Sequence, residues 1–187
     1  WCGRHDVVES RLADAVVARA GGKPPASLAA YECLVRGLAH LRSYRDEDNR
    51  AARSLFEEAA TKDPAYALAH AYVALADLAI GGYADTPPDM LAAVLDRAEH
   101  AVVLAPEDPR CHRVLASARL FTRDHEAAEH HLRRSLTLNP CDADTMAHMS
   151  FLQTMRGKPL EALAWLDRAV LLNPIYPGWY EYDRSIA

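Results

Sequence analysis

A proline that returns at a regular interval is the feature that most constrains how this chain can fold. Two nearly identical Leu-Asn-Pro runs end at Pro140 and Pro174, and Pro106 lies the same interval earlier, which gives a period of about 34 residues. The step from Pro64 to Pro106 is longer and equals the same period with about eight residues inserted. The turn-rich run over residues 81–88 has the composition of such an insertion. Self-similarity at this period is typical of repeat architectures.

Each repeat is predicted to contain two helices and a short turn. In the unit that ends at Pro140, apolar spacing predicts helices over residues 109–121 and 125–138, joined by a turn at 122–124. The prolines mark the boundaries between units, because proline cannot sit in a helix interior. The second helices carry a recurring core-facing pattern of small, large and small side chains: Ala52, Phe56 and Ala59, then Ala128, Leu132 and Ser135, then Ala162, Leu166 and Ala169.

The composition favours helices over sheets. Among the 187 residues there are 35 Ala and 23 Leu but only 11 Val and 3 Ile. Alanine and leucine are strong helix formers, whereas β-branched residues prefer strands. We therefore expect an all-α protein and disfavour the nucleotide-binding α/β enzymes.

These residues resemble the tetratricopeptide repeat over residues 28–187. The likeness lies in the period, the small–large–small pattern and the terminal proline. It is weaker in the first helices, where the family's aromatic position holds His112 and Met146 and its usual glycine is Ala116 and Ser150. The resemblance implies an α-α superhelix, or solenoid, of antiparallel helix pairs. It contains four units ending near Pro64, Pro106, Pro140 and Pro174, followed by a truncated fifth.

Residues 1–27 are expected to form a separate N-terminal helix, over 6–20, and a Gly/Pro linker. This helix could cap the stack or occupy its groove. Because the chain begins at Trp1 and not at Met, we expect it to be a segment of a longer protein. Residues 30–37 and 175–180 are similar to repeat regions of bacterial signalling proteins, in which the repeats follow an adenylate or guanylate cyclase domain or a CadC-type DNA-binding domain.

The sequence contains none of the common catalytic motifs. There is no Gly-rich phosphate loop and no Gly-x-Ser-x-Gly elbow. His125 and His130 are at positions i and i+5, which places them about 140° apart on a helix, whereas a zincin pair needs positions i and i+4. We therefore predict a non-catalytic interaction scaffold without metal or cofactor. A helical metal-dependent enzyme or metal-binding module stays open as the alternative, with a second set of candidate ligands: Cys111, His112, His130, His131, Cys141 and His148.

The resemblance also implies a concave surface, lined by the first helices, that binds a peptide or a partner helix. The predicted groove residues are Leu68, Tyr72, Leu75, Arg110, Arg113, Ser117, Phe121, Asp144, His148, Phe151 and Met155. They are mostly apolar with a few charges at one end, which favours a helix-in-groove mode over a charge clamp. The alternative for Phe121, Phe151 and Met155 is ordinary packing between repeats.

The C-terminal end of the chain is expected to favour self-association. A truncated fifth unit would leave apolar surface around Leu163, Trp165 and Leu166 uncovered, which favours self-association.

The net charge of −5 argues against nucleic-acid contact. No apolar run is long enough for a membrane span and no secretory leader is visible. Four irregularly spaced cysteines suit a cytoplasmic protein.

Overall fold

The computed structural model describes residues 27–41 and 45–187, and every regular element in those ranges is helical. The predicted helix over 6–20 lies outside the described residues. The helices are α2 (Leu28–Leu41), α3 (Asp46–Lys62), α4 (Ala67–Gly81), α5 (Pro88–Leu104), α6 (Pro109–Phe121), α7 (His125–Leu138), α8 (Ala143–Met155), α9 (Pro159–Leu172) and α10 (Trp179–Ile186), with a short 3₁₀ turn, η2 (Tyr83–Asp85), between α4 and α5.

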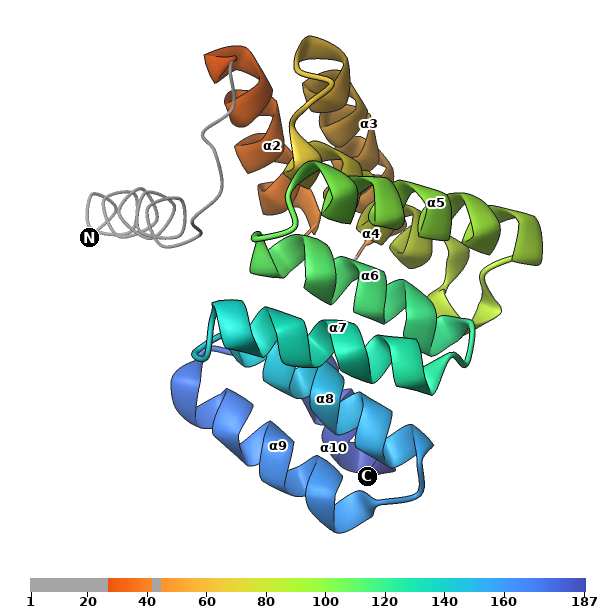
Figure 1. Cartoon of the computed structure of the whole chain (residues 1–187), viewed down its shortest axis with the longest axis vertical. Coiled ribbons are helices and arrows are strands. Elements are labelled where there is room, and N and C mark those ends of the chain that lie inside the picture. Colours follow the sequence, from red (N-terminus) through yellow and green to blue (C-terminus); the bar gives the residue numbers. More distant parts are fainter. Residues whose placement is uncertain (1–26, 42–44) are drawn as a thin grey trace.

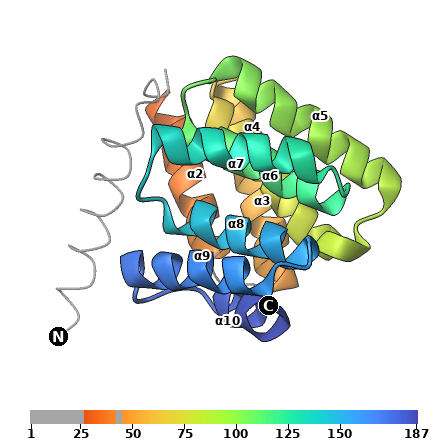
Figure 2. The ribbon, with the colours of Figure 1, turned by 60° about the horizontal axis from the view of Figure 1, so that its bottom comes forward.

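The helices form successive pairs that stack into an all-α superhelix, as predicted. The pairs are α2 with α3, α4 with α5, α6 with α7, and α8 with α9. Figure 1 shows the second helices α5, α7 and α9 in front, with α8 and α10 behind them. In Figure 2 the stack runs from α5 at the top to α9 and α10 at the bottom. The first helices α2, α4, α6, α8 and α10 contact one another in succession, so they form one face of the stack.

The helix boundaries predicted for the unit that ends at Pro140 are confirmed residue for residue by α6 and α7. The side chains of Asp108, Asp124 and Asp142 accept hydrogen bonds from backbone N–H groups in the first turns of α6, α7 and α8. Such N-caps satisfy donors that have no partner within the helix. The sequence thus carries its own start signals for three consecutive helices.

The predicted insertion is divided between loop and helix. Part of it lengthens the two helices of this unit: α4 has 15 residues and α5 has 17, whereas α6 has 13 and α7 has 14. The rest forms the connection that contains η2. Gly82 and Tyr83 both have positive φ, of 80° and 56°. This left-handed backbone is easy for glycine but costs energy for tyrosine.

The core follows the small–large–small pattern of the second helices. Eight of its nine predicted side chains are fully buried apolar groups and the ninth, Ser135, is also fully buried. Phe56 shows how closely the helices approach, because a Cβ atom added to Gly37 on α2 would lie 2.4 Å from the Phe56 ring carbon Cε1. Glycine at this position lets α2 and α3 pack across the aromatic ring.

The fifth unit contributes one helix, and that helix changes one expectation. Leu166 is fully buried, in a cluster that contains Tyr180 of α10. The prediction that Leu166 lies uncovered at the C-terminal end is therefore wrong, because α10 packs over it. The most exposed apolar side chains at this end are instead Leu160, Leu171 and Ile175.

Two of the candidate metal ligands form a contact between α6 and α7. The Nδ1 atoms of His112 and His131 are 3.0 Å apart and the rings stack. The other ring nitrogen of His112 lies 3.0 Å from the carbonyl oxygen of Pro106. Burial lowers the pKa of both imidazoles, and the neighbouring His112 further lowers that of His131, to about 4. The pair therefore stays neutral at pH 7.

Substituting Gly37→Ala tests the close approach of α2 and α3. We expect it to lower the free energy of unfolding by about 1–3 kcal/mol, because the added methyl overpacks Phe56. Gly178→Ala is the matched control, since nothing lies within 4 Å of its added Cβ, and it should leave urea unfolding nearly unchanged. Equal unfolding curves for both variants would contradict the packing argument.

The histidine pair predicts a loss of stability in acid. His131 has a folded pKa of about 4, below its unfolded value near 6.5, so its contribution is complete above pH 6.5 and is lost as the pH falls towards 4. Replacing His131 with Gln should reduce the difference in unfolding free energy between pH 7 and pH 4.5 by roughly 1–3 kcal/mol. An unchanged difference between pH 7 and pH 4.5 in the His131→Gln variant would contradict this prediction.

Candidate functional site

The first helices of the pairs carry all eleven predicted groove residues. Helix α4 contacts α6, α6 contacts α8, and α8 contacts α10, so these helices form one continuous surface. The predicted residues lie on α4 (Leu68, Tyr72 and Leu75), on α6 (Arg110, Arg113, Ser117 and Phe121) and on α8 (Asp144, His148, Phe151 and Met155). The structure divides them into a polar part, an apolar part and three buried side chains.

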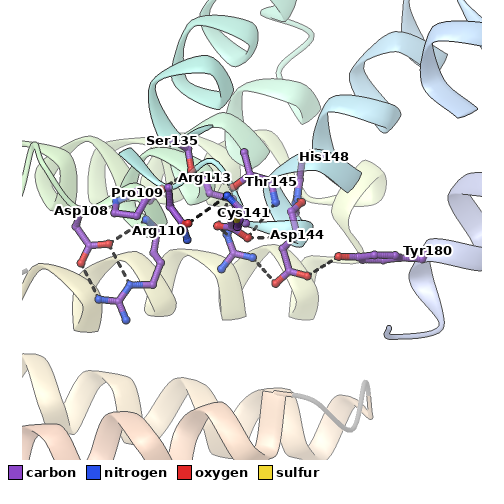
Figure 3. A network of polar contacts seen from close by, with 12 residues as sticks. Asp108, Pro109, Arg110, Arg113, Ser135, Cys141, Asp144, Thr145, His148 and Tyr180 are labelled. Carbon is purple, nitrogen blue, oxygen red and sulfur yellow. Dashed lines mark hydrogen bonds and ion pairs between the residues drawn. The ribbon is translucent and has the colours of Figure 1, made fainter. Parts of the chain in front are cut away.

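The polar part is an internally bonded network (Figure 3). Arg110 donates from Nε and Nη2 to the two carboxylate oxygens of Asp108, at 3.0 and 2.7 Å. Arg113 donates to Oδ2 of Asp144. The Tyr180 hydroxyl, from α10, donates to Oδ1 of the same carboxylate at 2.8 Å. The charges predicted at one end of the groove are thus paired within the chain.

Burial and charge pairing set the protonation states in this network. Burial alone would raise the pKa of the Asp144 carboxyl, but Arg113 and the Tyr180 hydroxyl outweigh it and hold the pKa below its usual value. Burial works against the charged form of Arg113, yet Asp142 and Asp144 raise its pKa. Burial, followed by Arg113, lowers the pKa of His148. Arg113 and Asp144 are therefore charged and His148 is neutral at pH 7.

Hydrogen bonds made by two side-chain hydroxyls connect the network to the second helix α7. The Ser135 hydroxyl, on α7, donates to the backbone carbonyl of Pro109 at 2.9 Å and lies 3.0 Å from the Thr145 hydroxyl. Thr145 in turn donates to Oδ2 of Asp142 at 2.9 Å. These bonds join α6, α7 and α8 across the boundary between two units. Ser135 therefore replaces the usual small apolar residue with one that makes a buried polar contact.

The apolar part is a row of aromatic side chains, which we call the aromatic row: Tyr83, Phe121 and Phe151. The ring centroids of Tyr83 and Phe121 are 5.6 Å apart, and those of Phe121 and Phe151 are 6.0 Å apart. Met155 follows one turn after Phe151 on α8 and is 44% exposed, while Leu75 is half-buried. Sequence reasoning missed Tyr83, because it belongs to the insertion and has no equivalent in the other units.

Three of the predicted groove residues face the core. Leu68, Tyr72 and Ser117 are buried, with 5%, 6% and 2% of their surface exposed. The Tyr72 ring packs 5.4 Å from that of Phe56, in the neighbouring unit. These three side chains position the surface and present little area to a partner.

The candidate metal ligands do not gather in the described part of the chain. Within residues 27–41 and 45–187 no group of three or more His, Cys, Asp or Glu side chains could hold a metal ion. Glu129, in the zincin-like run, bonds to Arg133 and Arg156. Over the same ranges no helix is both long and apolar enough to cross a bilayer.

Comparison with known proteins supports the fold. No protein-family model and no curated protein sequence matches the chain. Among solved structures it is similar to TTC0263, a thermophilic TPR protein from Thermus thermophilus, with 20% identity and a TM-score of 0.68 over 84% of this chain and 80% of the other. PilF of Pseudomonas aeruginosa gives 17% identity and a TM-score of 0.59, over 84% of this chain and 66% of PilF.

A third similar structure is YrrB, described as a TPR protein with an unusual peptide-binding site. It shares 15% identity and a TM-score of 0.54, over 84% of this chain and 75% of YrrB. At such low identities the likeness establishes the architecture alone. The chain therefore has the fold of a tetratricopeptide-repeat protein.

Proposed function

We propose that this protein is a non-catalytic scaffold that binds a protein or peptide across the surface of α4, α6 and α8. The observation that carries the proposal is the aromatic row, whose half-buried Phe121 and Phe151 pack partly against the core, together with the exposed Met155 one turn after Phe151. Aromatic and methionine side chains are enriched in interface cores. The peptide-binding site named for YrrB lends support from a similar fold.

The internal pairing of the charges indicates what kind of partner fits. Arg110 is only 14% exposed and Arg113 only 13%, and both already bond to carboxylates of this chain. Each guanidinium is largely buried, so a partner that needed either one would first have to break its ion pair with Asp108 or Asp144, which is costly. We therefore infer that binding relies on apolar contacts with the aromatic row, as when the apolar face of a helix lies in a groove.

We also propose what kind of larger protein this scaffold serves. Similarity of residues 30–37 and 175–180 to bacterial signalling repeats supports a role inside a larger signalling or transcription-regulatory protein of the cytoplasm. The natural sequence on either side of these 187 residues tests this role. A cyclase or DNA-binding domain there would support it, and a different kind of domain would contradict it.

A second interaction surface is proposed at the C-terminal end. Leu171 and Ile175 are 80% and 93% exposed, at the end of α9 and just after it. Exposed apolar patches favour association, so this end is a candidate for pairing of two copies.

Variants of the aromatic row test the main proposal. A displayed library of amphipathic peptides would be selected on the wild-type chain, and the best peptide measured by fluorescence anisotropy. Phe151→Ala should weaken its binding about 30-fold, as expected for a hot-spot aromatic side chain. The exposed Met155→Ser should weaken binding several-fold without disturbing the fold.

The matched control for these variants is Val103→Ser on α5, which is 76% exposed and lies on the opposite helix layer. It should leave binding unchanged. Equal affinity of all three variants, with unchanged circular dichroism, would show that the aromatic row does not bind the peptide.

Sedimentation equilibrium tests the second surface. If two copies pair through the end of α9, wild-type protein should dimerise at high concentration and Leu171→Glu should be monomeric, because a charge is costly to bury. A monomeric wild-type chain at millimolar concentration would refute pairing.

A further inference from the structure

Helix α10 carries a buried carboxyl group, that of Asp183. Asp183 is only 4% exposed, and its Oδ2 atom is buried without a hydrogen-bond partner among the residues that the structure describes. Burying an ionised carboxylate without a partner is strongly unfavourable. The Ser150 hydroxyl oxygen, on the adjacent α8, is likewise buried and unpaired.

The repeat register explains why this position is buried. Asp183 lies one repeat period after Met149, and Ser150 lies one period after Ala116. Met149 and Ala116 belong to one apolar cluster between the third and fourth units. Asp183 therefore occupies, between the fourth and fifth units, the position that an apolar methionine fills one repeat earlier.

Among the described residues of α8, α9 and α10, no charged group compensates Asp183. On α10 itself, Arg184 pairs with Asp167 of α9, at 3.2 Å, and Glu181 bonds to Tyr176. On α8, Asp144 is engaged by Arg113 and Tyr180, and His148 bonds to the backbone of Asp144. Burial alone raises the pKa of Asp183, to about 7.

The same helix contacts the candidate site directly. One turn before Asp183, Tyr180 donates its hydrogen bond to Asp144. The Trp179 ring packs 5.2 Å from that of His148. Release of α10 would therefore remove the hydroxyl that holds Asp144 and uncover His148, both of which are predicted groove residues (Figure 3).

We propose that α10 is a pH-sensitive clamp on the partner-binding surface, docked while the Asp183 carboxyl is protonated and released when it ionises. The regulatory meaning of this clamp rests on the function proposed above, but its physical operation does not. The proton leaves the carboxyl to solvent, and the charged side chain follows it out of the interface between α8, α9 and α10.

The direction of the pH dependence follows from the pKa difference. The pKa of Asp183 is about 7 when α10 is docked and near 3.8 when the carboxyl is exposed to water. A raised carboxyl pKa means that docking is fully favourable below pH 4 and weakens as the pH rises towards 7. Above pH 7 both states are ionised and docking changes no further.

Amide hydrogen exchange of the full chain, followed by NMR and corrected for intrinsic rates, measures the clamp. The amides of residues 183–187 report opening of α10. Their opening equilibrium should rise at least tenfold between pH 5 and pH 8, which corresponds to a pKa difference of one unit or more. The Asp183 carboxyl carbon, observed by ¹³C NMR, should titrate near pH 7.

Three variants test whether the Asp183 carboxyl group causes the pH dependence of α10 opening. Asp183→Asn keeps the shape but cannot ionise, so it should abolish the pH dependence of opening. Asp183→Met copies the residue of the preceding unit and should keep α10 protected at pH 8 more strongly than in the wild type. Glu161→Gln, which removes an exposed carboxylate of α9 that pairs with Lys158 and not with α10, is the matched control and should show the pH dependence of the wild type.

Equal protection of α10 at pH 5 and pH 8 would overturn the proposal. Persistence of the pH effect in Asp183→Asn, or a carboxyl titration below pH 5, would overturn it as well. None of these measurements needs a partner. If the selected peptide binds the aromatic row but α10 does not respond to pH, the clamp is rejected and the scaffold function stands. If α10 responds to pH but the peptide does not bind the aromatic row, the scaffold function is rejected and the clamp stands.

Discussion

Close packing of helices over alanine is the constraint on which the rest of this structure depends. In three second helices a small, a large and a small side chain are fully buried at the same positions of the repeat. Alanine allows the helix axes to approach, and one large side chain fills the space between them. Because each unit buries its apolar face only against its neighbours, the stack grows by repetition and leaves one face of first helices available.

The polar network adds specificity to this apolar packing. Buried charges are unfavourable unless they are paired and hydrogen-bonded. Arg113 satisfies this condition through Asp144, whose other oxygen accepts from Tyr180 two helices further along the chain. The network therefore joins α6, α8 and α10 through one carboxylate. Asp183 is the contrasting case, since its carboxyl is buried by the same packing and its Oδ2 atom has no partner in the described part of the chain.

The sequence predicted the repeating parts well and the unique parts poorly. The helices α6 and α7 and the buried small–large–small pattern follow from period and apolar spacing, which are local or repeated signals. Tyr83 could not be predicted, because its place beside Phe121 depends on the path of a single insertion. Leu166 was misjudged, since the short helix α10 suffices to cover it.

By itself, the sequence determined an all-α stack of helix pairs with one repeating period. The period is a one-dimensional property, so it can be read without coordinates. Only the tertiary structure decided which of the eleven surface residues are buried, which are paired and which are open to a partner. Those outcomes depend on contacts between residues that are far apart in the sequence, such as Arg113 with Asp144 and Asp144 with Tyr180, and no local pattern encodes them.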